Sequence, residues 1–333
     1  MENLVKHLRD HHALAKLIGE SPAFLKAIER VPLIAKTESP VLITGETGTG
    51  KELAARAVHY LSPRAPSPFV AVNCGSLTET LLEDELFGHE RGAFTNADRQ
   101  RRGLIAEAMH GTLFLDEIDS LPPKAQSDLL RVIQEKTYRA IGSSQQQEAD
   151  VRIVAATNKP LEQQMAAGSF RPDLYYRLAV FSIRLPPLRD RVEDIIPLAK
   201  HFLSKHMPSD RIMVLTAQAC SRLQSCKWPG NVRELENAII RGIQYGEDGR
   251  IDTEDLGLAL DTDEPSSLSS AESLRTAKKQ VVAAFERDYL IRLMSEHHGN
   301  VSKAAGAAKK ERRDLGKLLK RHRIDPESFR LSG

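Results

Sequence analysis

The sequence predicts an α/β fold: a parallel sheet flanked by helices, followed by a helical subdomain and a small all-α domain. Three observations support this prediction. Short apolar runs alternate with amphipathic stretches in the first half of the chain, strand signals stop after residue 185, and apolar residues recur at helical spacing near the C-terminus. The 333 residues leave room for two or three domains, because single cores rarely grow beyond about 250 to 300 residues.

Four apolar runs predict the strands of the sheet. They read PVLITG, PFVAVNC, GTLFLDE and VRIVAATN, and helical patterns separate them. Near-continuous apolar strands that alternate with helices are typical of a parallel sheet whose two faces are both covered. We therefore expect an α/β subdomain over residues 11–185, preceded by a short N-terminal tail at residues 1–10.

Three further segments follow the predicted sheet. Residues 186–260 contain several helical patterns and no strand signal, which predicts an all-helical subdomain. Residues 261–278 begin DTDEPSSLSS, which is polar and acidic and has no apolar period, so we interpret them as a linker. Residues 279–333 hold an apolar stretch at helical spacing, a stop at HHGN and two more short helical patterns, which predicts a small helical domain.

The charge of the chain is unevenly distributed, although the formal net charge is only +2. Residues 271–333 hold 15 lysines and arginines against 8 acidic residues, a net of +7. That leaves 32 against 37, a net of −5, for residues 1–270. A basic tail on an acidic body indicates that the tail binds a polyanion such as DNA; a solvated basic helix surface is the alternative.

Composition excludes several classes of protein. No apolar run approaches the roughly 20 residues that cross a bilayer, and MENLVKHLRDHH lacks the apolar segment of a secretory signal. We therefore expect a cytoplasmic protein that does not bind membranes. The cysteines Cys74, Cys220 and Cys226 form no CxxC pair and are odd in number, which favours buried reduced thiols over a disulfide framework or a zinc site.

A glycine-rich segment directly follows the strand candidate VLIT and precedes the helical pattern ELAARAVHYL. Glycines let a loop wrap closely enough for its N–H groups to face phosphate oxygens, the following helix N-terminus adds partial positive charge, and Lys51 adds a full one. Glu52 stands where such loops commonly carry a magnesium-binding Ser or Thr. The alternative is a glycine-rich turn without a ligand. The predicted nucleotide-binding residues of this segment are Gly45, Glu46, Thr47, Gly48, Thr49, Gly50, Lys51 and Glu52.

Two adjacent carboxylates, Asp116 and Glu117, follow the apolar run LFL. Ligands of parallel sheets bind at this end of the strands, and neighbouring carboxylates are poor core residues. We expect Asp116 to hold a hydrated Mg²⁺ ion and Glu117 to orient or deprotonate the water that attacks a phosphate. The alternative is a solvated surface pair, which is weak at a strand end about 65 residues after a phosphate loop.

Two more strand ends carry polar side chains. Asn73 ends PFVAVN, and Thr157 and Asn158 end VRIVAATN. Buried strands rarely finish in an amide that has no partner, so these side chains are candidates for sensing a γ-phosphate. A turn cap is the alternative for each of them.

Three arginines are candidates for contact with a transferring phosphate. Arg171 and Arg177 lie six residues apart in FRPDLYYRL. A guanidinium stabilises charge on the phosphate, and one supplied by a neighbouring subunit would couple hydrolysis to assembly. Arg233, in WPGNVREL, is expected near the start of a helix that Asn231 caps, where it would swing over bound nucleotide as part of a lid. Surface arginines are common, so spacing alone does not decide their role.

These motifs together resemble the sigma-54-dependent enhancer-binding proteins, which are bacterial AAA+ transcription activators. The resemblance covers nearly all of residues 18–240 and runs, in order, through GESPAF, GETGTGKE, AVNC, ELFGHERGAFT, GTLFLDEID, RIVAATN, FRPDLYYRL and WPGNVREL. It implies an AAA+ P-loop NTPase fold with an α-helical lid, with ATP and Mg²⁺ as cofactors. It also implies a homo-oligomeric ring, expected to be a hexamer, with ATP sites between subunits.

The resemblance also implies roles for individual residues. GETGTGKE looks like the ordinary P-loop of the family, which accounts for Glu52. Asn73 looks like a switch residue that contacts Glu117, and Asn158 looks like the first sensor. By the same resemblance, Arg171 and Arg177 look like the trans-acting fingers, and Arg233 looks like the second sensor. Ile18 looks like a further nucleotide contact.

The family's signature loop, GAFTGA, occurs here as GAFTNA. In relatives this loop presses its Phe and Thr against the sigma factor, so the resemblance assigns that contact to Phe94, Thr95 and Asn96. Asn96 replaces the second glycine, and asparagine tolerates positive φ better than most other residues. The change is either a benign variant or the mark of a member that no longer opens promoters through sigma-54.

The C-terminal segment GNVSKAAGAAKKERRDLGKLLKRHRI resembles a Fis-type helix-turn-helix. Ala304 and Ala305 would let two helices approach, and Leu315 and Leu319 would form the inner face of the second helix. A lysine pair replaces the usual Gly-hydrophobic turn. A basic amphipathic helix used for oligomer contacts is the alternative. The predicted DNA-binding residues are Lys310, Arg312, Arg313, Lys317 and Arg321.

The sequence therefore predicts a ring-forming ATPase that binds DNA upstream of a promoter and uses hydrolysis to remodel the sigma-54 RNA polymerase. Two alternatives stay open: a DNA-binding regulator with nucleotide-controlled assembly that does not engage sigma-54, and a general AAA+ chaperone without DNA preference. Barely a dozen residues precede the predicted ATPase, so we expect either a trans-acting regulator or a longer product that was trimmed.

Overall fold

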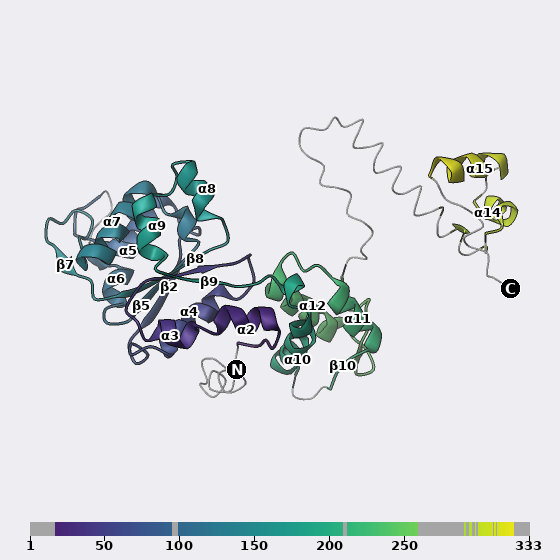
Figure 1. Ribbon diagram of the computed structural model, residues 1–333, viewed down its shortest axis with the longest axis horizontal. Coiled ribbons are helices and arrows are strands. Elements are labelled where there is room, and N and C mark those ends of the chain that lie inside the picture. The colour runs from purple at the N-terminus through teal and green to yellow at the C-terminus, as the bar shows by residue number, and fades with distance from the viewer. Residues whose placement is uncertain are drawn as a thin grey trace. The chain divides into compact units, whose positions relative to one another are not determined.

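The computed structural model describes residues 17–94, 99–208, 212–258, 290, 293–294, 297, 299–308, 310 and 312–322. They belong to two compact units, Met1–Leu258 and Ala259–Gly333, each of which is described by itself (Figure 1). The predicted tail at residues 1–10 and the predicted linker at residues 261–278 lie outside the described residues. No helix within the described ranges is long and apolar enough to span a bilayer.

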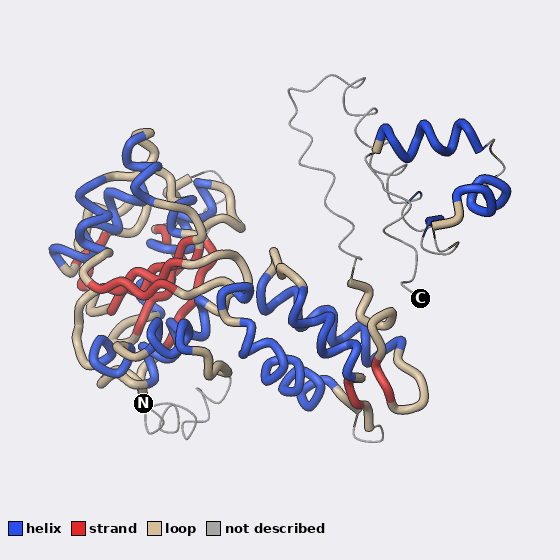
Figure 2. The backbone as a smooth tube through the Cα atoms, turned by 45° about the vertical axis from the view of Figure 1, so that its right-hand side comes forward, coloured by secondary structure: helices blue, strands red, loops and turns tan. Residues whose placement is uncertain are grey.

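A five-stranded parallel sheet forms the centre of the first unit (Figure 2). Its strands, in spatial order, are β2 (Phe69–Asn73), β5 (Thr112–Asp116), β8 (Arg152–Thr157), β1 (Val41–Thr44) and β9 (Phe181–Arg184). The parallel α/β fold that the sequence predicts is confirmed. The four apolar runs predict β1, β2, β5 and β8 but not β9, because in β9 only Ile183 is buried while Ser182 and Arg184 are exposed.

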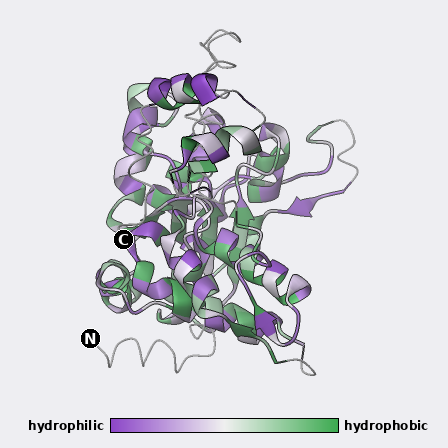
Figure 3. Ribbon diagram, turned by 90° about the vertical axis from the view of Figure 1, so that its right-hand side faces the viewer, coloured by the Kyte–Doolittle hydropathy of each residue, from purple (hydrophilic) through white to green (hydrophobic). Residues whose placement is uncertain are grey.

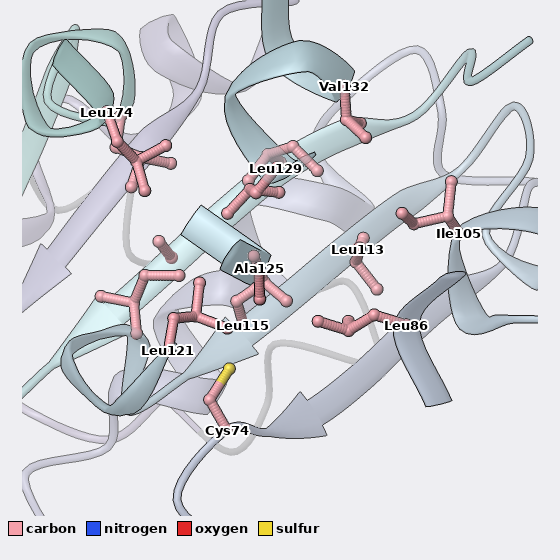
Figure 4. Packing of buried hydrophobic residues seen from close by; sticks show 14 of the residues in the cluster. Cys74, Leu86, Ile105, Leu113, Leu115, Leu121, Ala125, Leu129, Val132 and Leu174 are labelled. Carbon is pink, nitrogen blue, oxygen red and sulfur yellow. The ribbon is translucent and has the colours of Figure 1, made fainter. Parts of the chain in front are cut away.

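Helices cover both faces of the sheet. On one face lie α5 (Glu79–Phe87), α6 (Leu104–Glu107), α7 (Pro123–Glu135), α8 (Leu161–Ala166) and α9 (Pro172–Leu178), and on the other α2 (Pro22–Ile28), α3 (Val31–Ala35) and α4 (Lys51–Tyr60). Leu113 and Leu115 of β5 pack with Leu129 in the first layer (Figure 4), whereas Phe114 packs in the second. Successive side chains alternate between faces, so a continuously apolar strand contributes to both layers.

Helix α7 shows how local sequence sets an element. Pro123 occupies its first turn, where the missing N–H costs nothing. Ala125, Leu129 and Val132 recur at intervals of four and three residues and are buried, so one stripe of the helix faces the sheet. The helix ends where Lys136 adopts a φ of 55°. The surrounding helices likewise carry both hydrophobic and hydrophilic residues (Figure 3).

A helical lid follows the sheet within the same unit. It comprises α10 (Ile195–His206), α11 (Ala217–Ser225) and α12 (Asn231–Tyr245), and two short 3₁₀ turns, η2 (Leu188–Asp190) and η3 (Val192–Asp194), connect it to β9. Trp228 is buried in its core. The all-helical prediction is wrong in one detail: β10 (Val214–Leu215) pairs in parallel with β11 (Arg250–Ile251). Two-residue strands are too short for a periodic signal in the sequence.

Two small antiparallel pairs and a 3₁₀ turn complete the α/β part. β3 (Gly88–His89) pairs with β4 (Arg101–Arg102), β6 (Thr137–Tyr138) pairs with β7 (Gln147–Glu148), and η1 (Ile118–Ser120) follows β5. The β3–β4 pair brackets the GAFTNA segment. All three cysteines are free, but only Cys74 is buried, so the prediction of buried thiols is wrong for Cys220 and Cys226.

The second unit contains α14 (Val301–Ala307) and α15 (Arg312–Arg321). The Asn300 side chain caps α14 by accepting hydrogen bonds from two backbone N–H groups. A small hydrophobic cluster joins the two helices to residues that precede them: Leu290, Leu293, Met294, Ala304, Ala305, Leu315 and Leu319.

Candidate nucleotide site

The glycine-rich loop connects β1 to α4 at the carboxyl edge of the sheet. Gly48 has a φ of 77°, and Gly50, with a φ of 100°, precedes the first helical residue, Lys51. Both values lie in the left-handed region, which glycine adopts without strain. Lys51 Nζ donates to the carbonyls of Gly45 at 2.9 Å and Glu46 at 3.2 Å, so its ammonium group lies within the loop. Burial lowers the pKa of Lys51, while Asp116 and Glu117 oppose that shift.

Asp116 and Glu117 lie at the carboxyl end of β5. Burial raises the pKa of Asp116, against the opposing effects of the Glu117 N–H and of Lys51. Glu117 has left-handed backbone angles, with φ 53° and ψ 48°. Its carboxylate lies against Gly75, since a Cβ at Gly75 would come within 2.2 Å of Glu117 Oε2. The chain therefore turns at Glu117, directly after Asp116, the last residue of the strand.

Strand register brings the other predicted polar groups to the same edge. Asn73 pairs with Asp116 in the β2–β5 ladder, and Thr157, at the end of β8, pairs with Thr44, which directly precedes the loop. Asn158 follows Thr157 and donates through Nδ2 to Thr47 Oγ1 at 2.9 Å. Residues more than 100 positions apart in the sequence thus meet at one site.

A cavity of about 480 Å³ lies at this edge, between the loop and the lid. Apolar residues such as Phe24 and Phe202 and charged residues such as Lys51 line it together, which suits a nucleotide with an apolar base and a charged phosphate chain. Gly45 and Glu46 are outside its lining. The predicted residues that do line it are Ile18, Thr47, Gly48, Thr49, Gly50, Lys51, Glu52, Asn73, Asp116, Glu117, Asn158 and Arg233.

Asn73 and Glu117 both line the cavity, but no hydrogen bond joins them among the described residues. Asn73 Oδ1 instead accepts from the Gly75 N–H at 2.8 Å. Gly75 thus lies between the amide of Asn73 and the carboxylate of Glu117. The switch role of Asn73 stays a prediction.

Arg171, the N-cap residue of α9, and Arg177, within that helix, both lie outside the cavity of their own subunit. Arg171 pairs with Asp173 at 2.6 Å and donates to Ser127 Oγ at 3.2 Å. Arg177 is in the last turn of α9 and is exposed. Neither arginine lines the cavity of its own subunit, and their role as fingers stays a prediction.

Arg191 is a cavity residue that sequence reasoning missed. It is only 2% exposed, it donates to the carbonyl of Thr49 at 3.1 Å, and its guanidinium lies 5.0 Å from the centre of the Phe24 ring. Burial lowers its pKa, against the opposing effect of Asp194. In the sequence Arg191 stands in the charged segment LRDRVEDII, which does not reveal a partner 142 residues away.

Asn231 does not cap α12 as the sequence predicts. Gly230 holds the N-cap position, and the Glu234 carboxylate accepts its N–H at 2.8 Å. Asn231 is the first helical residue, with a φ of 53°, and its side chain bonds to Leu188 and to the glycine-rich loop. The prediction fails because the Asn231 side chain bonds to Leu188 and Thr47, which are distant in the sequence, instead of to the first N–H groups of its own helix.

Two further groups of predicted contacts are the sigma-factor residues of the first unit and the DNA-binding residues of the second. Phe94 is 46% exposed, and its ring centre is 4.9 Å from that of His89, which belongs to β3. Thr95 and Asn96 lie outside the described residues. On α15, Leu315 and Leu319 are buried. The predicted DNA-binding residues, all exposed, are Lys310, Arg312, Arg313, Lys317 and Arg321.

A glycine-rich phosphate loop with its lysine, two carboxylates at the end of a neighbouring strand and a helical lid define a P-loop ATPase of the AAA+ class. Residues 17–184 match the family described as the Sigma-54 interaction domain, and residues 189–273 match the AAA+ ATPase lid domain. The chain belongs to the sigma-54 interaction domain family.

Relatives and solved structures agree with this assignment. The chain is 46% identical over 279 residues to the Nif-specific regulatory protein of Azotobacter vinelandii, covering 81% of this chain and 53% of that protein. It is 42% identical over 318 residues to the transcriptional regulatory protein GlrR of Escherichia coli, covering 94% and 69%. It thus spans about half the length of the Azotobacter relative. The structure of NtrX from Brucella abortus in complex with ATP matches with a TM-score of 0.67 and 32% identity, covering 97% of this chain and 73% of that one.

Proposed function

We propose that the chain is an ATP-driven transcription regulator that assembles into a ring, binds DNA upstream of promoters and uses hydrolysis to remodel the sigma-54 RNA polymerase. The observation that carries the proposal is the cavity in which Lys51, Asp116 and Glu117 converge beneath Arg233 of the lid. Membership of the sigma-54 interaction domain family supports the choice of target.

The residues of the cavity fit ATP with Mg²⁺. The loop N–H groups and Lys51 would hold the β- and γ-phosphates, because positive φ at Gly48 and Gly50 turns the backbone around an anion. Carboxylate oxygens are the ligands that Mg²⁺ prefers, and Asp116 is half-buried beside Lys51. When bound, the ion would neutralise charge on the phosphates.

Glu117 would hold and deprotonate the attacking water. Phosphoryl transfer depends mostly on positioning and charge stabilisation, so a carboxylate fixed by a strained backbone suits this task. Asn158, linked to the loop through Thr47, would sense the terminal phosphate. Asn73 would receive Glu117 when the site switches state. Arg171 and Arg177 would complete the site of the neighbouring subunit.

The second unit would supply DNA binding. α14 and α15 pack through small and apolar residues, which leaves the basic residues of α15 exposed for groove edges and phosphates. We therefore assign residues 279–333 to a helix-turn-helix domain, with Lys310, Arg312, Arg313, Lys317 and Arg321 as DNA contacts. Phe94, Thr95 and Asn96 would form the sigma-factor contact.

The first test is hydrolysis by the purified chain. Glu117→Gln should lower kcat by about 100-fold or more, because it removes a general base, while ATP still binds. Glu247→Gln, a substitution of an exposed lid carboxylate, serves as the matched control and should leave kcat unchanged. A Glu117→Gln variant that hydrolyses ATP at the wild-type rate would remove the assignment.

Asn96 favours a second candidate, a regulator that does not engage sigma-54. In vitro transcription with sigma-54 polymerase separates the two. Activity that disappears in Thr95→Ala supports the proposed function. An inactive wild type that gains activity in Asn96→Gly supports the second candidate, because the change restores the family's loop.

A further inference from the structure

The lid rests directly on the phosphate loop through backbone contacts. The Val232 N–H donates to the Gly48 carbonyl at 3.0 Å. A Cβ at Gly48 would lie 2.3 Å from the Gly230 carbonyl oxygen, so a larger residue at Gly48 would separate the two segments. The loop that holds phosphate and the first turn of α12 are therefore in van der Waals contact.

The Asn231 side chain joins three segments at this point. It is fully buried. Its Nδ2 donates to the Thr47 carbonyl at 3.0 Å and to Glu46 Oε2 at 3.2 Å, and its Oδ1 accepts the Leu188 N–H at 2.7 Å. One amide thus connects the loop, the first turn of α12 and the η2 turn between sheet and lid.

A second contact reinforces the same junction. Arg189 of η2 donates to both oxygens of the Glu46 carboxylate, at 2.8 and 2.6 Å. Such a two-pronged pair fixes orientation as well as distance. The hydrogen bonds from Arg189 hold the pKa of Glu46 near 2, so the carboxylate stays charged at neutral pH. Glu46 faces this junction and not the cavity.

Arg233 lies two residues beyond Asn231 and lines the cavity. No hydrogen bond or ion pair occupies its guanidinium among the described residues, and its charge acts on Lys51 across the site. Because α12 begins at Asn231, whatever fixes Asn231 on the loop also fixes the backbone from which Arg233 extends.

We propose that Asn231 is a positioning residue for ATP hydrolysis: it holds the lid in register with the phosphate loop, so that Arg233 meets the terminal phosphates. The Glu46–Arg189 pair supports that register, since Glu46 Oε2 accepts from both Arg189 and Asn231. Asn231 does not itself touch the nucleotide. The inference rests on the proposed function of the cavity as the ATP site, and it adds a means by which loop and lid move as one body.

Asn231→Asp is the sharpest variant, because it keeps the size of the side chain and the acceptor for the Leu188 N–H. It replaces the Nδ2 donor with an oxygen that faces the Thr47 carbonyl and the Glu46 carboxylate. We expect kcat to fall roughly 10- to 100-fold, as misplaced catalytic groups do, with a smaller change in ADP affinity. Glycine tolerates the positive φ of this position but has no side chain, so Asn231→Gly should also lower kcat.

Two controls separate positioning from a structural role. Asp248→Ala changes an exposed lid residue with a comparable φ of 50°, and it should keep wild-type kcat. Arg233→Ala should lower kcat on its own, and adding Asn231→Asp should lower it by less than about twofold more, since both act on one contact. A structural defect would instead multiply with the loss from Arg233→Ala.

The outcomes also distinguish this inference from the proposed function. If the wild type does not hydrolyse ATP, the proposed function fails. If the wild type is active but Asn231→Asp keeps its kcat, the positioning role is wrong and the ATPase assignment stands. Losses that multiply in the double variant, or an Arg233→Ala variant with wild-type kcat, would equally overturn the role of Asn231.

Discussion

At the scale of single residues, the backbone of Glu117 explains how two adjacent carboxylates serve one site. Neighbouring residues of an extended strand point to opposite faces. Glu117 avoids this by adopting φ 53°, at a cost of roughly 1 kcal/mol or more for a residue with a Cβ. Asp116 and Glu117 therefore both line the cavity. The strain falls at the residue that is proposed to act on water.

The Glu46–Arg189 pair leads to a prediction about how the unfolding free energy depends on pH. Arg189 lowers its pKa from 4.5 to about 2 in the folded protein, so its contribution to stability is complete above about pH 4.5 and declines as the pH falls toward 2. The difference in unfolding free energy between wild type and Glu46→Gln should thus be constant near neutral pH and shrink below about pH 4.5. Urea unfolding at a series of pH values measures it, and a difference that stays constant in acid would contradict the pairing.

At the scale of elements, the sequence predicts the strands that are apolar along their whole length and misses those that are not. Strands β1, β5 and β8 lie between other strands and are buried on both faces, so their composition alone is informative. β9 is an edge strand with exposed polar residues. Its pairing with β1 is decided by the tertiary structure, which local composition does not encode.

Helix α7 carries a prediction about packing. Leu129 is 1% exposed and packs against the sheet (Figure 4), so Leu129→Ala should lower the unfolding free energy by about 2 to 5 kcal/mol through lost contacts and a cavity. Leu81→Ala on α5 is the matched control: Leu81 is 54% exposed, and the change should cost less than about 0.5 kcal/mol. Equal losses in urea unfolding would show that this layer is not the core.

At the scale of the whole molecule, the sequence predicts the residues that occur in contiguous motifs. It identifies the loop, the two carboxylates and Arg233, because each stands in a recognisable local pattern. It does not reveal Arg191 or the true partners of Asn231, since those contacts join segments 142 and 184 residues apart. Such contacts follow from how the lid folds back onto the sheet, and no local pattern encodes them.

The proposed ring makes a prediction about mixed subunits. Glu117→Gln and Arg171→Ala should each be inactive alone, if Arg171 acts on the neighbour's site. In an equal mixture, about one site in four combines an intact Glu117 with an intact Arg171 from the next subunit. ATPase assays of the mixture should therefore recover about a quarter of wild-type activity. A mixture as inactive as its components would place Arg171 outside the neighbour's site.

The basic tail leads to a prediction about how DNA affinity depends on salt concentration. Arg312→Ala combined with Arg313→Ala should weaken DNA binding and reduce the slope of log affinity against log salt by about 2, one for each lost phosphate contact. Mobility shifts at several salt concentrations measure the slope. Glu247→Gln, in the first unit, should leave it unchanged. An unaltered slope in the double variant would favour the alternative use of the helix in oligomer contacts.

The order of the strands sets the spacing of the elements that carry the charged residues of the site. Lys51 follows β1 and Asp116 ends β5, and β8 lies between these strands. The strands from which the loop and Asp116 extend are therefore two strand spacings apart, roughly 10 Å, and main-chain hydrogen bonds fix that separation. Substitutions of side chains can change what the site contacts, whereas the spacing of these strands is set by the backbone.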